Sequence, residues 1–253
     1  MSSAPVTDDQ FLNGRVKLRQ FASGHRAGSD AVFLAATIPT DFKGLVVDAG
    51  SASGAVGLMA GSRATNARLR CVEIDQKEAA LARENIASNA MTDRADVFIA
   101  DLFAPHHERT EAGLGANDAD LVLSNPPFLD ESNGRVSPDH DRVRAHVMPD
   151  GGLEKWIVSC LAMLKADGIL TMIHRADRLD DLLNMMKGRF GEIVILPIHS
   201  RAHDAATRIL ISGKRNSRAP LKILPGLVIH RDDGGFTQQA ASIHQGEAPI
   251  ILR

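Results

Sequence analysis

Short β-branched runs alternate with amphipathic helical segments along most of this 253-residue chain, and this alternation restricts the fold more than any other feature. The segments 76–90, 151–167 and 177–190 space their apolar residues three and four apart, as helices with one buried face do. Strands that alternate with such helices form βαβ units around a parallel sheet, with helices on both faces. The expected strands are 45–49, 69–74, 95–100, 119–124, 168–174, 193–198 and 207–212.

One connection breaks this alternation. The last two expected strands are joined by the short segment 199–205, "HSRAHDA", whereas a parallel pair needs a crossover of roughly a dozen residues or more. The final strand must therefore run antiparallel to the one before it. The sequence predicts a doubly wound α/β fold with a seven-stranded, mostly parallel sheet and an antiparallel last strand.

The two ends of the chain lie outside this pattern. Near the start, 16–21 is expected to be a strand, and 29–37 a helix capped by Ser29 or Asp30. After the sheet, 221–240 is expected to hold one or two more strands joined by an Asp-Gly-Gly turn. We expect a single domain over 1–253, made of an N-terminal extension (1–40), a core (41–215) and a C-terminal appendage (216–253).

The composition argues against several classes of protein. The 29 basic and 31 acidic side chains give a net charge of -2, which is unlike proteins that coat nucleic acid through bulk charge. Cys71 and Cys160 each stand in an apolar segment and are expected in the core, not in a disulfide or zinc site. The start of the chain lacks a signal-peptide pattern, and the run 31–38 is too short to cross a bilayer. We expect a cytoplasmic protein without a membrane or metal partner.

Acids and glycines gather just after the first three expected strands, where open α/β sheets bind their ligands. The first of these loops, "DAGSASGAVG", is small enough for a ligand to approach its backbone closely. Glu73 ends the second strand, where an acid can bind both hydroxyls of a ribose, and Asp101 follows the third, where it can accept from an adenine amino group. The candidate cofactor-binding residues of these loops are Asp48, Gly50, Ser53, Gly54, Glu73, Ile74, Asp101 and Leu102.

The charge of these loops favours S-adenosylmethionine over a dinucleotide. An NAD-type loop requires G-x-G-x-x-G, but Ala52 takes the second glycine position, and Asp48 would repel a pyrophosphate. S-adenosylmethionine contains a ribose and an adenine without any phosphate, and its ammonium and sulfonium groups are cations that suit a site lined with carboxylates. The sequence contains no P-loop.

These motifs resemble those of the Rossmann-like class I methyltransferases that use S-adenosylmethionine and carry an Asn-Pro-Pro-aromatic motif. "VVDAGSASGAVGL", "CVEID", "ADLF" and "SNPPF" resemble the four family motifs in order, and the likeness covers nearly the whole chain. "LRQFASGHRAGSDAVFLAA" and "IHRADRLDDLL" are similar to bacterial tRNA-valine methyltransferases, which modify an adenine beside the anticodon at its N6 amine. The resemblance implies the same activity on tRNA. Ala52 departs from the usual glycine of the family, and we expect the loop to keep its path.

The segment "SNPPF" would form a rigid elbow directly after a buried strand. An adenine amine is a poor nucleophile, so two acceptors for its N–H bonds would both orient it and favour a tetrahedral nitrogen. The Asn125 side-chain oxygen and the Pro126 carbonyl are the expected acceptors, while Phe128 would stack on the base. Pro126 and Pro127 stiffen the bend and remove competing N–H donors. The candidate catalytic residues are Asn125, Pro126, Pro127 and Phe128, and Asn125 would also border the cofactor.

Several assignments stay open at this level. The elbow recognises a flat NH₂ group beside a ring, so a guanine N2 amine of rRNA or a protein glutamine would fit as well, and a non-catalytic RNA-binding protein of the same fold is a further alternative. Ser29 and Asp30 lie where a loop could close over the methionine end of the cofactor, and Arg26 could contact cofactor or RNA. The polar loop 130–146 is consistent with a lid, and its His140 and His146 do not form a metal-binding pattern.

Overall fold

The structure is a computed structural model that describes residues 5–24, 26–127, 129–130, 147–148 and 151–253. The strands are β1 (Val6–Phe11), β2 (Val16–Phe21), β3 (Leu45–Ala49), β4 (Arg68–Glu73), β5 (Ala95–Ile99), β6 (Ala119–Ser124), β7 (Leu129–Asp130), β8 (Val147–Met148), β9 (Leu164–Arg175), β10 (Phe190–His199), β11 (Ala206–Arg215), β12 (Lys222–Ile223) and β13 (Leu227–Val228). The helices are α1 (Ser29–Ala35), α2 (Ala55–Arg63), α3 (Gln76–Ser88), α4 (His106–Glu111), α6 (Gly152–Met163), α7 (Leu179–Met186) and α8 (Gln238–His244), with a 3-10 turn η1 (Ala176–Arg178).

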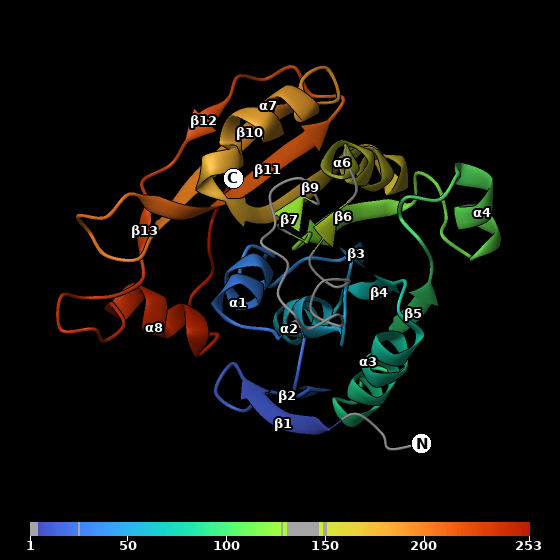
Figure 1. Cartoon of the computed structure of the whole chain (residues 1–253), viewed down its shortest axis with the longest axis horizontal. Helices are drawn as coiled ribbons and strands as arrows, with labels where there is room; N and C mark the ends of the chain where they lie inside the picture. Colours follow the sequence, from blue (N-terminus) through green and yellow to red (C-terminus); the bar gives the residue numbers. More distant parts are fainter. Residues whose placement is uncertain (1–4, 25, 128, 131–146, 149–150) are drawn as a thin grey trace.

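A central sheet organises the molecule (Figure 1). Within the described residues it has nine strands, in the order β12, β10, β11, β9, β6, β3, β4, β5, with β13 also beside β10. β5, β4, β3, β6 and β9 run parallel, and β11 is antiparallel to both β9 and β10. The mostly parallel sheet with an antiparallel last strand is therefore confirmed. The sheet exceeds the predicted seven strands because β12 and β13 join its edge beside β10. Both are only two residues long and lie in the segment 221–240, where one or two more strands were expected.

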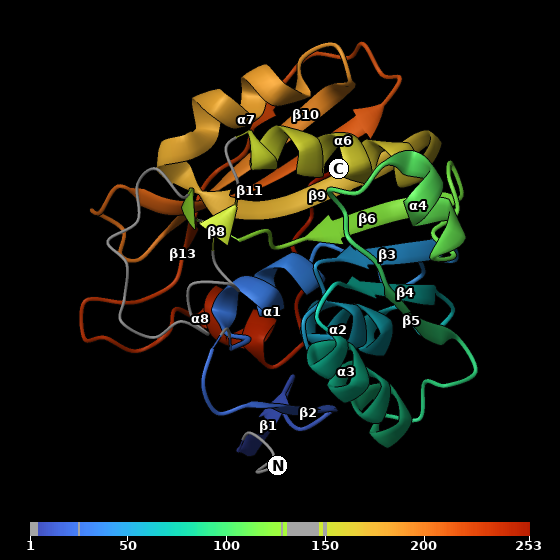
Figure 2. The ribbon, with the colours of Figure 1, turned by 45° about the vertical axis from the view of Figure 1, so that its right-hand side comes forward.

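Helices cover both faces of this sheet, as the alternating pattern requires. α1, α2 and α3 lie on one face, and α6 and α7 lie on the other (Figures 1 and 2). Successive side chains of a strand point to opposite faces, and β3 shows the result. Val46 joins the apolar core with α1 and α2, whereas Leu45 and Val47 join a second core with α6 and α7. All five residues of β3 are buried, which is typical of a parallel strand covered on both sides.

The ends of the chain differ from the expectation in three places. β2 is present as predicted, but β1 was not predicted because its side chains alternate between exposed and half-buried without an apolar period. The Asp-Gly-Gly turn does not join two strands; it closes a single bridge between His230 and Phe236. The seven-residue helix α8 follows that bridge, and its short apolar pattern gave no helical signal.

Helix α1 forms where expected, but the expected cap is wrong. The N-cap residue is Gly28, and no side chain caps this end of the helix. Ser29 and Asp30 lie in the first turn and use their side chains for distant partners: the Ser29 hydroxyl lies 2.9 Å from Nε2 of His244, and Asp30 accepts from Nε of Arg208 at 3.0 Å. These partners come from α8 and β11, which a local capping rule does not consider.

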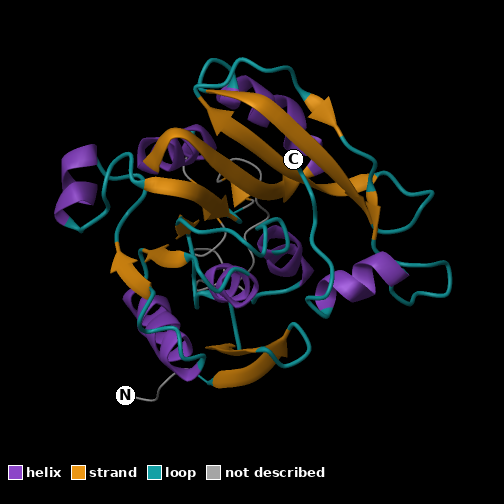
Figure 3. Cartoon of the chain, turned by 180° about the vertical axis from the view of Figure 1, so that it is seen from behind, coloured by secondary structure: helices purple, strands orange, loops and turns teal. Residues whose placement is uncertain are grey.

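The last residues of the chain attach the appendage to the core. The Ile250 N–H donates to the Ala36 carbonyl at 2.8 Å, and Arg63 of α2 donates to the Ala248 carbonyl at 3.1 Å. Arg253 donates to the Ser212 hydroxyl at 2.8 Å, so the C-terminus crosses the face of the long strands that α7 leaves open (Figure 3). The tail thus adds two of its own side chains, Ile250 and Leu252, to the apolar core on this face of the sheet.

Two asparagines, Asn85 of α3 and Asn89 at its C-cap, hold the N-terminal hairpin. The Asn85 side chain accepts from the Arg19 N–H at 2.8 Å and donates to the Arg19 carbonyl at 2.8 Å, and Asn89 pairs with the N–H and carbonyl of Lys17 in the same way. Because these asparagines are four residues apart on a helix, their amides meet alternate residues of β2 as a neighbouring strand would. Asn85 is fully buried and also donates to the Ser53 carbonyl at 2.9 Å, which ties the hairpin to the loop after β3.

We predict that Asn85→Ala lowers the free energy of unfolding by about 2–4 kcal/mol, because three backbone groups lose their partner, among them the Ser53 carbonyl in a buried hydrogen bond. Asn89→Ala is the matched control, since its half-exposed site is open to water, and its loss should be about 1 kcal/mol. Urea unfolding of both variants measures the difference. Equal losses would contradict a special role for the buried amide.

Candidate active site

The carboxyl ends of four parallel strands meet at one edge of the sheet. Ala49, the last residue of β3, pairs with Val72 of β4 on one side and with Ser124 of β6 on the other. Glu73 of β4 pairs with Ile99 of β5. This register places the loops after β3, β4, β5 and β6 side by side, so the glycine loop, the acids and Asn125 lie at the same edge, as the sequence predicts.

The loop after β3, here called the glycine loop (residues 50–54), is held by backbone hydrogen bonds. The N–H groups of Gly50 and Ser51 both donate to the Val72 carbonyl, at 3.0 and 2.9 Å. Gly50 and Gly54 have φ angles of 76° and 88°, in the left-handed region that glycine tolerates best. Gly54 is the N-cap of α2, and Ser53 is buried beneath the turn. The loop therefore presents mostly backbone at the mouth of the sheet.

Asp48 lies beneath the glycine loop. Asp48 is 2 % exposed, and its Oδ2 accepts from the Gly57 N–H of α2 at 2.8 Å. Its Oδ1 is buried and no described residue donates a hydrogen bond to it. Burial raises the pKa of Asp48 to about 7, and the nearby charge of Glu73 adds to this shift. A cation bound at this loop would lower that pKa again, so the carboxylate is arranged to respond to a positively charged ligand.

Glu73 connects two loops. Its Oε2 accepts from the Ala52 N–H at 2.8 Å, and its Oε1 accepts from the N–H groups of Ile74 and Asp75 at 2.8 and 2.9 Å. Burial raises the pKa of Glu73 despite these hydrogen bonds, which lower it. Carboxylate oxygens have about four acceptor positions in total, so one remains for a ligand hydroxyl.

Ala52 stands where the resembling family usually has glycine, and its backbone nevertheless adopts the left-handed conformation. Its φ is 45°, a conformation that costs an alanine roughly 1 kcal/mol. The hydrogen bond from its N–H to Glu73 is consistent with the loop holding this residue in place. Alanine is small enough to occupy the position without a branched side chain.

Glu78, an acid in the first turn of α3 beside Glu73 and Asp75, is not among the predicted site residues. Burial raises its pKa to about 7, and the charges of Glu73 and Asp75 raise it further. The signal was present in "VEIDQKE", where three acids fall within six residues of the end of β4. The α3 N-cap is Asp75, whose side chain accepts from the N–H groups of Lys77 and Glu78.

Two candidate residues, the polar Asp101 and the apolar Leu102, lie in the loop after β5. Asp101 Oδ1 accepts from the Phe103 N–H at 2.7 Å in a local turn, and the half-buried carboxylate keeps a second oxygen for other donors. Leu102 is 4 % exposed and belongs to the core with α6. Ile74, after β4, is 59 % exposed and offers an apolar surface at the mouth of the site.

The Asn125 side chain carries an unused acceptor. Its Oδ1 is buried and has no hydrogen-bond partner among the described residues. A buried polar atom without a partner costs free energy, so this oxygen is available to a water or to a ligand donor. Pro126 is buried and Pro127 half-buried. Phe128 lies outside the described residues, as do residues 131–146 of the expected lid, including His140 and His146, so their placement stays a prediction.

Three candidates near the start of the chain have protein partners. Arg26 donates to Asp9 at 2.9 Å and to Thr7 at 2.7 Å, both on β1, so its guanidinium holds the hairpin. Ser29 and Asp30 open α1, which contacts β6 and β9, and their side chains bind His244 and Arg208. Their contact with a cofactor remains a prediction.

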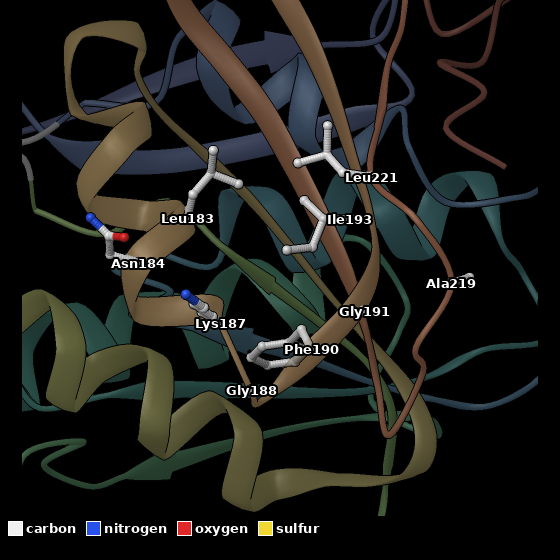
Figure 4. A pocket seen from close by; sticks show the side chains of 9 residues that line it. All are labelled: Leu183, Asn184, Lys187, Gly188, Phe190, Gly191, Ile193, Ala219 and Leu221. Atoms are coloured by element: carbon white, nitrogen blue, oxygen red, sulfur yellow. The ribbon is translucent and has the colours of Figure 1, made fainter.

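A groove of about 300 Å³ lies elsewhere, between α7 and the start of β10 (Figure 4). Leu183, Asn184 and Lys187 reach it from α7, and Phe190 and Ile193 from β10. Because β10 runs parallel to β9, its first residues stand at the amino edge of the sheet, opposite the glycine loop. The groove is therefore separate from the candidate site.

Two further observations concern the described part of the chain. It contains no group of three or more His, Cys, Asp or Glu side chains arranged to hold a metal ion. None of its helices is both long and apolar enough to cross a membrane. Cys71 and Cys160 are unpaired by disulfides and buried, which confirms their expected place in the core.

Comparison with known proteins gives matches over most of the chain. Residues 22–196 match the family model described as the methyltransferase small domain. The chain is 31% identical over 212 residues to the tRNA1(Val) (adenine(37)-N6)-methyltransferase of Porphyromonas gingivalis, covering 80% of this chain and 79% of the relative.

Solved structures share the fold. The crystal structure of a predicted O-methyltransferase from Agrobacterium tumefaciens superposes with a TM-score of 0.74 at 26% identity, covering 88% of this chain and 98% of that one. The structure of M. jannaschii TYW2 in complex with AdoMet superposes with a TM-score of 0.57 at 11% identity, covering 85% and 87%, which shows a shared fold alone.

We predict that Asp48→Asn stabilises the ligand-free protein at pH 8 more than at pH 5. The folded-state pKa of about 7 lies above the ordinary value of 3.8, so the wild-type protein loses stability as the pH rises through this window. The amide is neutral throughout and can still accept from Gly57. Thermal unfolding at pH 5, 6, 7 and 8 should show a gap in midpoint that widens with pH, and a constant gap would contradict the buried charge.

A second prediction concerns Ala52. Ala52→Gly should change the free energy of unfolding by less than about 0.5 kcal/mol, because relief of the left-handed strain offsets the greater freedom of the unfolded glycine. Ala52→Val should lose about 1–2 kcal/mol, since a β-branched residue is a true outlier at this φ. Urea unfolding compares the pair, and equal effects would show that residue 52 is not under strain.

Proposed function

Because the chain belongs to the methyltransferase small domain family and, within it, to the tRNA1(Val) (adenine(37)-N6)-methyltransferases, we propose that it methylates the N6 amine of an adenine in a valine tRNA. The position would be adenine 37, which the name of the relative gives. The single observation that supports this chemistry best is the buried Oδ1 of Asn125, directly after β6, which has no partner among the described residues. The activity would take place in the cytoplasm, where tRNA is found.

The residues present fit S-adenosylmethionine. The glycine loop offers backbone at the mouth of the sheet, Glu73 retains one acceptor position for a ribose hydroxyl, and the exposed Ile74 offers a surface for the adenine ring. The buried Asp48 adds negative charge beneath the loop when it is ionised. Its Oδ1 has no partner among the described residues and can interact with a cation or a bridging water. When bound, S-adenosylmethionine supplies an activated methyl group on a sulfonium. Asp101 would accept from the adenine of this cofactor.

The elbow, defined as Asn125, Pro126 and Pro127, would prepare the target amine. Asn125 Oδ1 and the Pro126 carbonyl accept its two N–H bonds, which turns the nitrogen lone pair out of conjugation with the ring and toward the methyl donor. The prolines hold both acceptors in place before the base arrives, so most of the acceleration comes from orientation over about 3 Å of approach. After transfer the nitrogen is cationic and acidic, and its proton leaves to Asn125, the carbonyl or water. No dedicated general base is needed.

The atom that receives the methyl group in this proposal is a nitrogen, although one structural neighbour is described as a predicted O-methyltransferase. A hydroxyl has a single O–H and would use only one of the two elbow acceptors, leaving the other buried and unpaired. A flat NH₂ group uses both. The amine is therefore favoured, and Phe128 is proposed to stack on its ring, with the base turned out of its stack.

We predict that Asn125→Ala lowers kcat for methyl transfer to unmodified tRNA by about 100- to 1,000-fold, the usual effect of removing one group that stabilises a transition state. Asn184→Ala, an exposed asparagine of the remote groove, is the matched control and should retain full activity. The assay measures radiolabelled methyl groups in tRNA, ribosomal RNA and protein. A fully active Asn125→Ala protein would rule out the elbow mechanism.

The substrate is tested separately from the chemistry. Nucleoside mass spectrometry of tRNA from cells that lack this protein should show the loss of N6-methyladenosine, restored by the wild-type gene. Unchanged N6-methyladenosine together with label in ribosomal RNA or in protein glutamine would move the substrate to those alternatives. No label in any fraction would favour a non-catalytic RNA-binding protein.

A further inference from the structure

We propose that Trp156 is a positioning residue that fixes the elbow relative to the glycine loop, an inference that rests on the proposed function of the same site. Trp156 is the single tryptophan of the chain and projects from α6 onto the carboxyl edge of the sheet. It is 7 % exposed. Its contacts reach three of the loops that form the site.

The polar contact of Trp156 leads to the elbow. Its indole Nε1–H donates to the Ser124 hydroxyl at 2.9 Å, and this hydroxyl in turn donates to the Ala49 carbonyl at 2.9 Å. Ser124 directly precedes Asn125, and Ala49 directly precedes Gly50. The relay thus joins the last residue before the acceptor amide to the last residue before the glycine loop, across the register that pairs β3 with β6.

The apolar contact of Trp156 leads to the glycine loop. A Cβ atom at Gly50 would lie 2.8 Å from both Cζ2 and Cη2 of the indole, a distance that real side chains do not tolerate. Gly50 is therefore required by the tryptophan as well as by its φ of 76°. On its other side the indole meets Phe103 of the loop after β5, with 5.7 Å between ring centroids. One side chain thus sets the spacing of three loops.

A purely structural tryptophan would need only apolar neighbours and any acceptor for its N–H. Here the acceptor is a buried hydroxyl whose own proton is committed to the Ala49 carbonyl, so both hydrogen bonds have a defined direction. If the N–H is removed, the Ser124 hydroxyl is free to rotate, and the backbone at Asn125 loses one fixed point. A shift of about 1 Å between reacting groups can cost a hundredfold in rate.

The first experiment separates positioning from stability. Trp156→Phe, which keeps a ring but removes the N–H, and Ser124→Ala should each lower kcat by about 10- to 100-fold, with KM for S-adenosylmethionine changed less than about threefold. The double variant should be no slower than the slower single variant, because both remove the same relay. Additive losses, or losses confined to KM, would overturn the proposal.

The control is Thr171→Val, which removes another buried hydroxyl, one that lies 3.0 Å from the Ser212 hydroxyl between β9 and β11. It should lower the unfolding midpoint about as much as Ser124→Ala while leaving kcat unchanged. If kcat falls equally in this control, the loss in Ser124→Ala reflects stability and the relay is not special.

The second experiment does not require methyl transfer. Because Trp156 is the only tryptophan, its fluorescence reports directly on the contact with the glycine loop. Saturation with S-adenosylhomocysteine should change the emission of the wild-type protein, and Ser124→Ala should shift the emission of the free protein. Unchanged emission in both cases would overturn the inference. Absent methyl transfer by the wild-type protein, with these emission changes present, would instead count against the proposed function.

Discussion

The backbone pairing of Ala49 with Val72 and Ser124 is the constraint on which the site depends. Parallel strands place their carboxyl ends at one edge, and this register makes β3, β4 and β6 end within one residue of each other. A shift by one residue would turn every side chain of a strand to the other face. Asp48 would then leave its place under the glycine loop, and Asn125 would no longer lie beside it.

Acidic side chains are concentrated at this edge, and backbone N–H groups offset part of the free-energy cost of burying their charge. Asp48, Glu73 and Glu78 are all held where burial raises their pKa values. Glu73 is stabilised by three backbone N–H groups from two loops, whereas Asp48 has one. A cationic cofactor would supply the compensation that is missing, since carboxylates that are costly when alone are favourable beside a positive charge. The site thus lacks a positive charge beside its buried carboxylates, and the proposed ligand is a cation.

Hydrogen bonds from side chains to backbone connect this edge to the rest of the molecule. Asn85 binds both the hairpin strand β2 and the glycine loop, and the chain ahead of the sheet is thereby attached to the cofactor side of the site. Trp156 attaches α6 to the opposite side through Ser124. Both side chains are buried, and the hydrogen bonds from Asn85 to Ser53 and from Trp156 to Ser124 are buried as well, so water competes little with them.

The sequence by itself determined the alternating strands and helices of the core, the antiparallel last strand, and the position of the acids and Asn125 after the strands, because these follow from local periodicity, loop length and the rule that ligands bind at carboxyl ends. It also identified Ala52 as the unusual member of the glycine loop. Tertiary structure alone decided that Ser29 and Asp30 bind α8 and β11 instead of capping α1, that β1 pairs with β2, and that the tail covers the sheet. It also decided the place of Trp156. The physical reason is distance along the chain: the partner of Ser29 is 215 residues away, and no local pattern specifies which distant group will fill a polar or apolar gap.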